Sequence, residues 1–116
     1  MTRVLVKKPG QAPEMKEIKF TREELSKKLG TLDIEMLDIG VDGRLALIPG
    51  IAAFADRLAK FKSRSLNFEI GCRYYREEVY GTVIFAGRAL NGRIVSLNDY
   101  QAEKIVRYFE DKAVKV

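Results

Sequence analysis

Histidine and tryptophan are absent from this sequence of 116 residues, and cysteine occurs only once. Without histidine the chain cannot build a Ser-His-Asp triad or a Cys-His pair. The usual zinc sites need several cysteines or histidines, so they are excluded as well. One cysteine cannot form an internal disulfide, which excludes a disulfide scaffold and favours a reducing compartment.

Nucleotide-binding fingerprints are also missing, because neither GxxxxGK[ST] nor GxGxxG occurs. The apolar run at the amino terminus is too short for a signal peptide, and no stretch approaches the roughly 20 apolar residues of a membrane span. We therefore expect a cytoplasmic protein that uses no cofactor and no metal and does not associate with a membrane.

The composition is that of one folded domain, which we place over residues 1–116. Hydrophobic residues make up 47% of the chain and charged residues 32%, values typical of a globular protein. There are 21 Lys and Arg against 16 Asp and Glu, which gives a net charge of +5. Such a charge supports weak attraction to phosphate but no specific contact.

The first third of the chain predicts a hairpin and a helix. Residues 3–8 contain a short apolar run, Ile18 and Phe20 alternate with Lys19 in residues 15–20, and Pro and Gly between the two segments mark the turn. Thr21 then has the capping-box spacing to Glu24 at a helix start, and Gly30 suits the left-handed residue at its end.

The middle of the chain predicts a second hairpin and a second helix. We expect residues 31–40 to be extended, Asp42-Gly43 to form a two-residue turn, and residues 44–48 to be the return strand. Apolar residues then follow a 3.6-residue period over 51–61, which predicts a helix.

The last third predicts more strands and a final helix. Three strands are expected, over residues 66–74, 79–90 and 93–97. Asn91-Gly92 is a hairpin signal, and Asn98 with Gln101 has the spacing of a helix cap. The fold class is therefore α+β: a largely antiparallel sheet of hairpins with about three helices packed mainly on one face.

The only thiol, Cys72, lies on the apolar side of the strict alternation that begins at Leu66. Arg73 alternates to the opposite side, and the chain has no histidine to activate the thiol. We interpret Cys72 as a small buried hydrophobe rather than a nucleophile.

Basic and aromatic residues form the best candidate binding surface. Arginines could contact phosphates while tyrosines stack on bases, or the tyrosines could anchor a protein partner. The structural alternatives are solvating charges and half-buried tyrosines, and Glu77 and Glu78 would repel phosphate. The candidate residues are Lys60, Lys62, Arg64, Arg73, Tyr74, Tyr75, Arg76, Tyr80, Arg88 and Arg93.

Asp33, Glu35 and Asp38 are the best carboxylate cluster. They could hold a hard cation or act as an acid/base pair. We favour the alternative, the solvent face of an amphipathic strand. Lys7 and Lys8 are interpreted as charges on an edge strand, which need no site.

Both ends of the chain resemble the domain of unknown function 3846 family. The similar pieces are VLV, PG, PE and KEI in residues 4–18, Leu25 to Gly30, GTVIFAG in residues 81–87, and GRIVSLND in residues 92–99. They lie in the two ends of the chain, and the sequence departs from the family between about Pro49 and Glu78.

The resemblance implies a small protein or module of phages, plasmids and other mobile elements, sometimes beside or fused to antirestriction-type domains. No activity and no functional residue come with it. We therefore expect an accessory module that binds a macromolecule, with a protein as the partner and nucleic acid as the alternative. An enzyme remains a third hypothesis, and it would need a deep pocket that brings Asp33, Glu35 or Glu69 near a lysine of shifted pKa.

Overall fold

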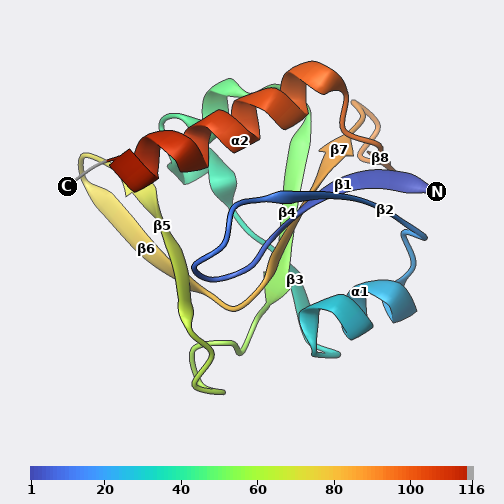
Figure 1. Ribbon diagram of the computed structural model, residues 1–116, viewed down its shortest axis with the longest axis horizontal. Coiled ribbons are helices and arrows are strands. Elements are labelled where there is room, and N and C mark those ends of the chain that lie inside the picture. The colour runs from blue at the N-terminus through green and yellow to red at the C-terminus, as the bar shows by residue number, and fades with distance from the viewer. Residues whose placement is uncertain (115–116) are drawn as a thin grey trace.

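The computed structural model describes residues 1–114 and has an α+β architecture with a mostly antiparallel sheet (Figure 1). Its elements are β1 (Thr2–Lys7), β2 (Glu14–Ile18), α1 (Arg22–Leu29), β3 (Ile34–Met36), the 3-10 turns η1 (Ile39–Val41) and η2 (Leu45–Leu47), β4 (Ile51–Asp56), β5 (Leu66–Cys72), β6 (Tyr75–Tyr80), β7 (Val83–Arg88), β8 (Ile94–Val95) and α2 (Asp99–Val114). No helix among the described residues is long and apolar enough to cross a membrane.

The main sheet has the strand order β2-β1-β7-β4-β3, and β8 pairs with the far end of β7. All of these neighbours are antiparallel. β5 and β6 form a separate two-stranded hairpin between β4 and β7 in the chain. The hairpin stands beside the main sheet and reaches the carboxyl end of α2 (Figure 1).

Both faces of the main sheet are buried, because alternate residues of its central strands enter two different cores. On β7, Phe85 joins the core under α2 and the β5–β6 hairpin, whereas Ile84 joins the core under α1. Leu25 of α1 and Ile105 of α2 therefore pack against opposite faces. The expectation of helices mainly on one face is wrong.

The helix expected over residues 51–61 is instead the strand β4, so residues 1–114 contain two α-helices rather than about three. Ala53 and Ala55 face one core, and Ala52 and Phe54 face the other. A strand buried on both faces is apolar at nearly every position. Such a run matches a helical period as well as a strand period, which explains the error.

Two further expectations fail at residues with special backbone roles. Asp42-Gly43 is not a hairpin turn, and residues 44–48 do not return as a strand, because η1 and η2 flank Asp42. The long strand expected over 79–90 is divided at Gly81, which has a φ of 76° and lies between β6 and β7. There the chain leaves the hairpin and enters the main sheet.

The helix caps and two hairpins are confirmed. The Thr21 hydroxyl accepts the Glu24 backbone N–H at 3.2 Å, and Gly30 has a φ of 70° at the end of α1. The Thr21 N–H, however, donates to the Lys19 carbonyl rather than to Glu24. At α2 the full box forms: the Asn98 side chain accepts the Gln101 N–H at 2.8 Å, and the Gln101 side chain accepts the Asn98 N–H at 3.0 Å.

Asp42 connects three parts of the fold from a buried position. Its Oδ1 accepts the backbone N–H groups of Arg44 and Leu45, both at 3.0 Å. Its Oδ2 accepts the Gly71 N–H of β5 at 3.0 Å and the Tyr108 hydroxyl of α2 at 2.8 Å. Burial alone would raise the pKa of Asp42, but these four hydrogen bonds outweigh it and lower the pKa overall.

We expect Asp42→Asn to lower the free energy of unfolding by about 2–3 kcal/mol, because an amide oxygen replaces a charged acceptor of buried donors. Tyr108→Phe should cost about 1 kcal/mol, since it removes one of the four bonds. The carboxylate's contribution is fully present above about pH 4 and is lost as the pH falls through the lowered pKa. Urea unfolding at pH 7 and in acid measures both effects, and a constant gap between the parent and Asp42→Asn at every pH contradicts this role.

Candidate functional site

The ten candidate binding residues do not form one patch. They lie in three groups: Lys60, Lys62 and Arg64 after β4 with Tyr80 at the end of β6; Arg73, Tyr74, Tyr75 and Arg76 around the β5–β6 turn; and Arg88 and Arg93 at the β7–β8 hairpin. These places occupy different corners of the molecule (Figure 1). The seven residues of β5 alone span roughly 20 Å between the first two groups.

Several of these cations are engaged within the protein. Lys62 and Arg64 flank the buried Asp56 carboxylate, with nitrogen–oxygen distances of 3.1 and 3.8 Å. Arg64 also donates to the carbonyl of Gly30 at 2.9 Å. Arg76 pairs with Glu69 at 2.8 Å. Lys62 and Arg64 therefore hold the loop after β4 against the end of α1.

The three tyrosines are also separated. Tyr74 is 87% exposed and Tyr75 49% exposed at the β5–β6 turn, whereas Tyr80 is half-buried at the other end of the hairpin. The Tyr80 hydroxyl donates to Glu78 at 3.1 Å, and the Lys60 ammonium lies 5.9 Å from the centre of the Tyr80 ring.

The interpretation of Cys72 as buried is wrong, because its side chain is exposed. Phe68 and Ile70 on the same side of β5 are buried as expected. Cys72 lies at the end of the strand beside the turn, where the hairpin extends past the core. Alternation predicts the face of a residue but not where the covering layer ends.

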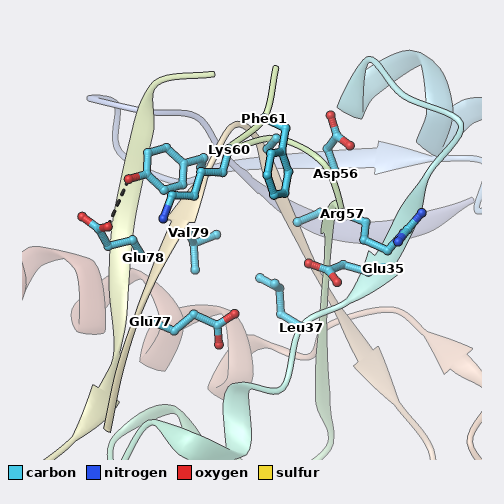
Figure 2. Close-up of a pocket in the computed structure, with 12 residues that line it drawn as sticks. Glu35, Leu37, Asp56, Arg57, Lys60, Phe61, Glu77, Glu78 and Val79 are labelled. Carbon is cyan, nitrogen blue, oxygen red and sulfur yellow. Dashed lines mark hydrogen bonds between the residues drawn. The ribbon is translucent and has the colours of Figure 1, made fainter. Parts of the chain in front are cut away.

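The first cavity, which we call the edge cleft, lies between β3 and β6 and has a volume of about 190 Å³ (Figure 2). Glu77 and Glu78 come from β6, Glu35 comes from β3, and Leu37 and Val79 lie between the two walls. Phe61, which is 83% exposed, stands beside Lys60 at one end of the cleft. Two of the ten candidates, Lys60 and Tyr80, line this cleft.

Both strands that border the edge cleft are unpaired on the side facing it. β3 pairs with β4 and with no other strand of the described chain. Leu37 donates its N–H to the Ala53 carbonyl at 2.8 Å. Because alternate residues of an antiparallel strand bond to the same neighbour, the backbone groups of Ile34 and Met36 point away from β4.

β6 presents a longer free edge. Within the described residues it pairs only with β5, and Cys72 and Tyr75 flank the two-residue turn as a bonded pair. Alternation then turns the backbone groups of Arg76, Glu78 and Tyr80 away from β5. The edge cleft is therefore bounded by two open strand edges.

The edge cleft is more acidic than basic. Burial raises the pKa of Glu35, and the nearby Glu77 carboxylate raises it further, while Arg57 opposes them. The Arg57 guanidinium is itself paired with Asp33, with 3.4 Å between the guanidinium nitrogen and the carboxylate oxygen. No group of three or more cysteine, aspartate or glutamate side chains in the described part of the chain is placed to hold a metal ion.

The second cavity, which we call the lysine cavity, is larger, at about 700 Å³. The loop between β1 and β2, the strand β5 and the helix α2 form its walls. Its lining is mainly apolar and includes Pro13, Phe68, Val106 and Phe109. Lys7, the last residue of β1, also lines the cavity, and its side chain is only 7% exposed.

Lys7 is held by a two-way contact with Asn67. Its ammonium donates to Asn67 Oδ1 at 2.8 Å and to the Lys8 carbonyl at 2.9 Å. In return Asn67 Nδ2 donates to the carbonyls of Lys7 at 2.8 Å and Gly81 at 2.6 Å. A bulge in β5 between Leu66 and Phe68 leaves Asn67 out of the strand pairing.

Burial lowers the pKa of Lys7. The interpretation of Lys7 as an edge charge is wrong, because β1 lies between β2 and β7. The sequence feature that indicates burial of Lys7 is its position two residues after the core residue Leu5, on the same face of the strand. Glu69 also lines the lysine cavity, as the enzyme hypothesis requires, but it is paired with Arg76, whereas Lys7 bonds to Asn67 and to the Lys8 carbonyl. The two groups therefore share a pocket without forming an acid/base pair.

Comparison with known proteins gives a family and no relative. No curated protein and no solved structure matches the chain. The family model of a domain of unknown function (DUF3846) matches residues 1–110. The match runs through the segment from Pro49 to Glu78, which we expected to depart from the family. The chain therefore belongs to the DUF3846 family.

Proposed function

We propose that this protein is an accessory module of a phage or other mobile element and acts by binding a partner protein rather than by catalysis. The observation that carries the proposal is the edge cleft, where the open edges of β3 and β6 border one acidic cavity. The partner would contribute an extended, basic segment.

Open strand edges are suited to an extended peptide. A peptide that adds to a sheet edge gains main-chain hydrogen bonds, while its alternate side chains enter neighbouring pockets. β6 offers the outward backbone groups of Arg76, Glu78 and Tyr80 along a strand of six residues. The floor of Leu37 and Val79 can receive an apolar side chain of the added segment.

The charge of the edge cleft favours a basic partner. Burial and then the Glu77 carboxylate raise the pKa of Glu35, and the two carboxylates repel each other in the free protein. A lysine or arginine of the partner would relieve that repulsion. Phe61, 83% exposed at the same cleft, provides an aromatic surface of the kind enriched at interfaces.

Nucleic acid remains the alternative, supported by the net charge of +5 and the exposed Arg88 and Arg93. The separation of the basic residues into three groups, with Lys62, Arg64 and Arg76 already paired, disfavours a continuous phosphate-binding surface. Nucleic-acid binding would fall steeply with added salt.

Selection of random decapeptides against the immobilised protein tests the proposal. We expect peptides rich in lysine or arginine, with apolar residues alternating between them. In ¹⁵N-labelled protein they should shift the backbone amides of β3 and β6. Phe61→Ser and Glu78→Lys should each weaken binding at least tenfold, because they remove the aromatic contact and reverse a charge.

Leu90→Ser is the matched control, because Leu90 is fully exposed at the β7–β8 hairpin, away from the edge cleft. It should leave the affinity unchanged. Selected peptides that are acidic, or shifts confined to other elements, would refute the proposal. Tight binding of a labelled oligonucleotide at low salt, lost at high salt and unaffected by Phe61→Ser, would support the alternative.

The burial of Glu35 and its repulsion by Glu77 also predict a pH effect on stability. Because the folded state raises the pKa of Glu35, its ionisation destabilises the fold as the pH rises from the ordinary glutamate pKa through the raised one. We expect Glu35→Gln to raise the free energy of unfolding at pH 7 by about 0.5 kcal/mol, the effect being limited by solvent screening.

The gain from Glu35→Gln should vanish below about pH 4, where the parent carboxyl is protonated. Glu17→Gln on the exposed face of β2 is the control and should have no effect at either pH. Denaturant unfolding at both pH values measures the difference, and a loss of stability at pH 7 would contradict an unfavourable ionisation of Glu35.

A further inference from the structure

The lysine cavity contains a buried cation, Lys7, that the peptide-binding proposal does not use. Lys7 is more than nine-tenths buried, and no ion pair of the described residues includes it. A buried ammonium is costly unless it is paired and hydrogen-bonded. Hydrogen bonds to Asn67 and to the Lys8 carbonyl take two of its three donors. The ammonium also lies 5.2 Å from the centre of the Phe109 ring. Its third donor makes no hydrogen bond to a described residue and is left for a ligand.

We propose that the lysine cavity binds a small monocarboxylate with an aromatic or aliphatic body, and that Lys7 holds its carboxylate. The volume of about 700 Å³ lies within the range of small-molecule sites. Phe68, Val106 and Phe109 provide apolar walls for the body of the ligand. Apolar atoms supply most of the exposed lining, although five of the thirteen lining residues are charged.

The other charged groups of the cavity favour a single negative charge. Arg76 and Lys112 lie on its lining, as do Glu69 and Glu110. Arg76 is paired with Glu69, whereas Lys7 carries one positive charge and takes part in no ion pair of the described residues. A monocarboxylate would complete the balance, whereas a phosphate dianion would bring a second charge against Glu69 and Glu110.

A preference for a charged ligand distinguishes a binding role of Lys7 from a purely structural one. Lys7 and Asn67 join β1 to β5, so loss of the ammonium can lower stability without any ligand. A ligand held by its charge must bind better than its neutral analogue, and that preference must disappear with the ammonium. If the contact between Lys7 and Asn67 only stabilises the fold, the protein should show no such preference.

Titration of ¹⁵N-labelled protein with 4-phenylbutyrate and with its neutral amide, 4-phenylbutanamide, tests the proposal. The acid should bind at least tenfold more tightly than the amide and should shift the amides of Lys7, Asn67 and Val106. Lys7→Met keeps an unbranched side chain and removes the charge, so it should abolish the preference while leaving the affinity for the amide within twofold.

Lys8→Met is the matched control, because Lys8 is the exposed neighbour of Lys7, and it should preserve the preference. Should Lys7→Met not fold, Ala12→Trp serves instead. Ala12 is exposed on the loop that forms one wall of the cavity. A bulky side chain there should weaken the binding of both probes, although Lys7 is retained in this variant.

Equal affinity of the parent for the acid and the amide would overturn the proposal, as would no binding of either at 10 mM. Persistence of the preference in Lys7→Met, or binding unaffected by Ala12→Trp, would overturn it too. Tighter binding of an acetylated tripeptide ending in phenylalanine than of 4-phenylbutyrate would assign the cavity to a peptide terminus instead. None of these results bears on the edge cleft, which lies on the other side of the hairpin.

Discussion

The structure depends on a sheet that is buried on both faces at β4 and β7. Successive residues of β7, such as Ile84 and Phe85, enter different cores, so neither face can be left open to water. α1 covers one face, and α2 together with the β5–β6 hairpin covers the other. The hydrophobic effect thus requires that both faces of the sheet be shielded from water. The arrangement of the chain follows from which elements can pack on each face.

The β5–β6 hairpin covers its face only in part, and both cavities result from this. The chain leaves the hairpin at Gly81 and enters β7, so β6 stands apart from β3 and does not pair with it. The edge cleft lies on the β6 side of the hairpin and the lysine cavity on the β5 side. Polar contacts position the hairpin: Asn67 bonds to the carbonyls of Lys7 and Gly81, and Asp42 accepts the Gly71 N–H.

The features predicted correctly are those that a few neighbouring residues determine. The cap at Thr21, the left-handed Gly30 and the box of Asn98 with Gln101 depend on contacts within one turn of helix. The hairpin expected at Asn91-Gly92 also forms, although Leu90 and Asn91 are the central residues of its turn. The Gly92 N–H donates to the Ala89 carbonyl at 2.9 Å, and Gly92 has a φ of 85°. The α+β class followed from such elements and was also correct.

The features predicted wrongly depend on what lies across the fold. β4 was taken for a helix because burial on both faces removes the alternation of polar and apolar residues. Asp42 was taken for a turn residue, although its partners Gly71 and Tyr108 are distant in the chain. For the candidate sites, the sequence pointed to Lys60 and Tyr80 at the edge cleft but gave Lys7 no role.

By itself, the sequence determined the chemistry available to this protein: no imidazole, one thiol, and a surplus of basic side chains. It also determined the local turns and caps, whose energies come from residues close in the chain. Only the tertiary structure decided which strands keep an open edge and that Lys7 is enclosed beneath α2. Strand order and burial arise from contacts between distant segments, and a residue's neighbours in the chain do not specify those contacts.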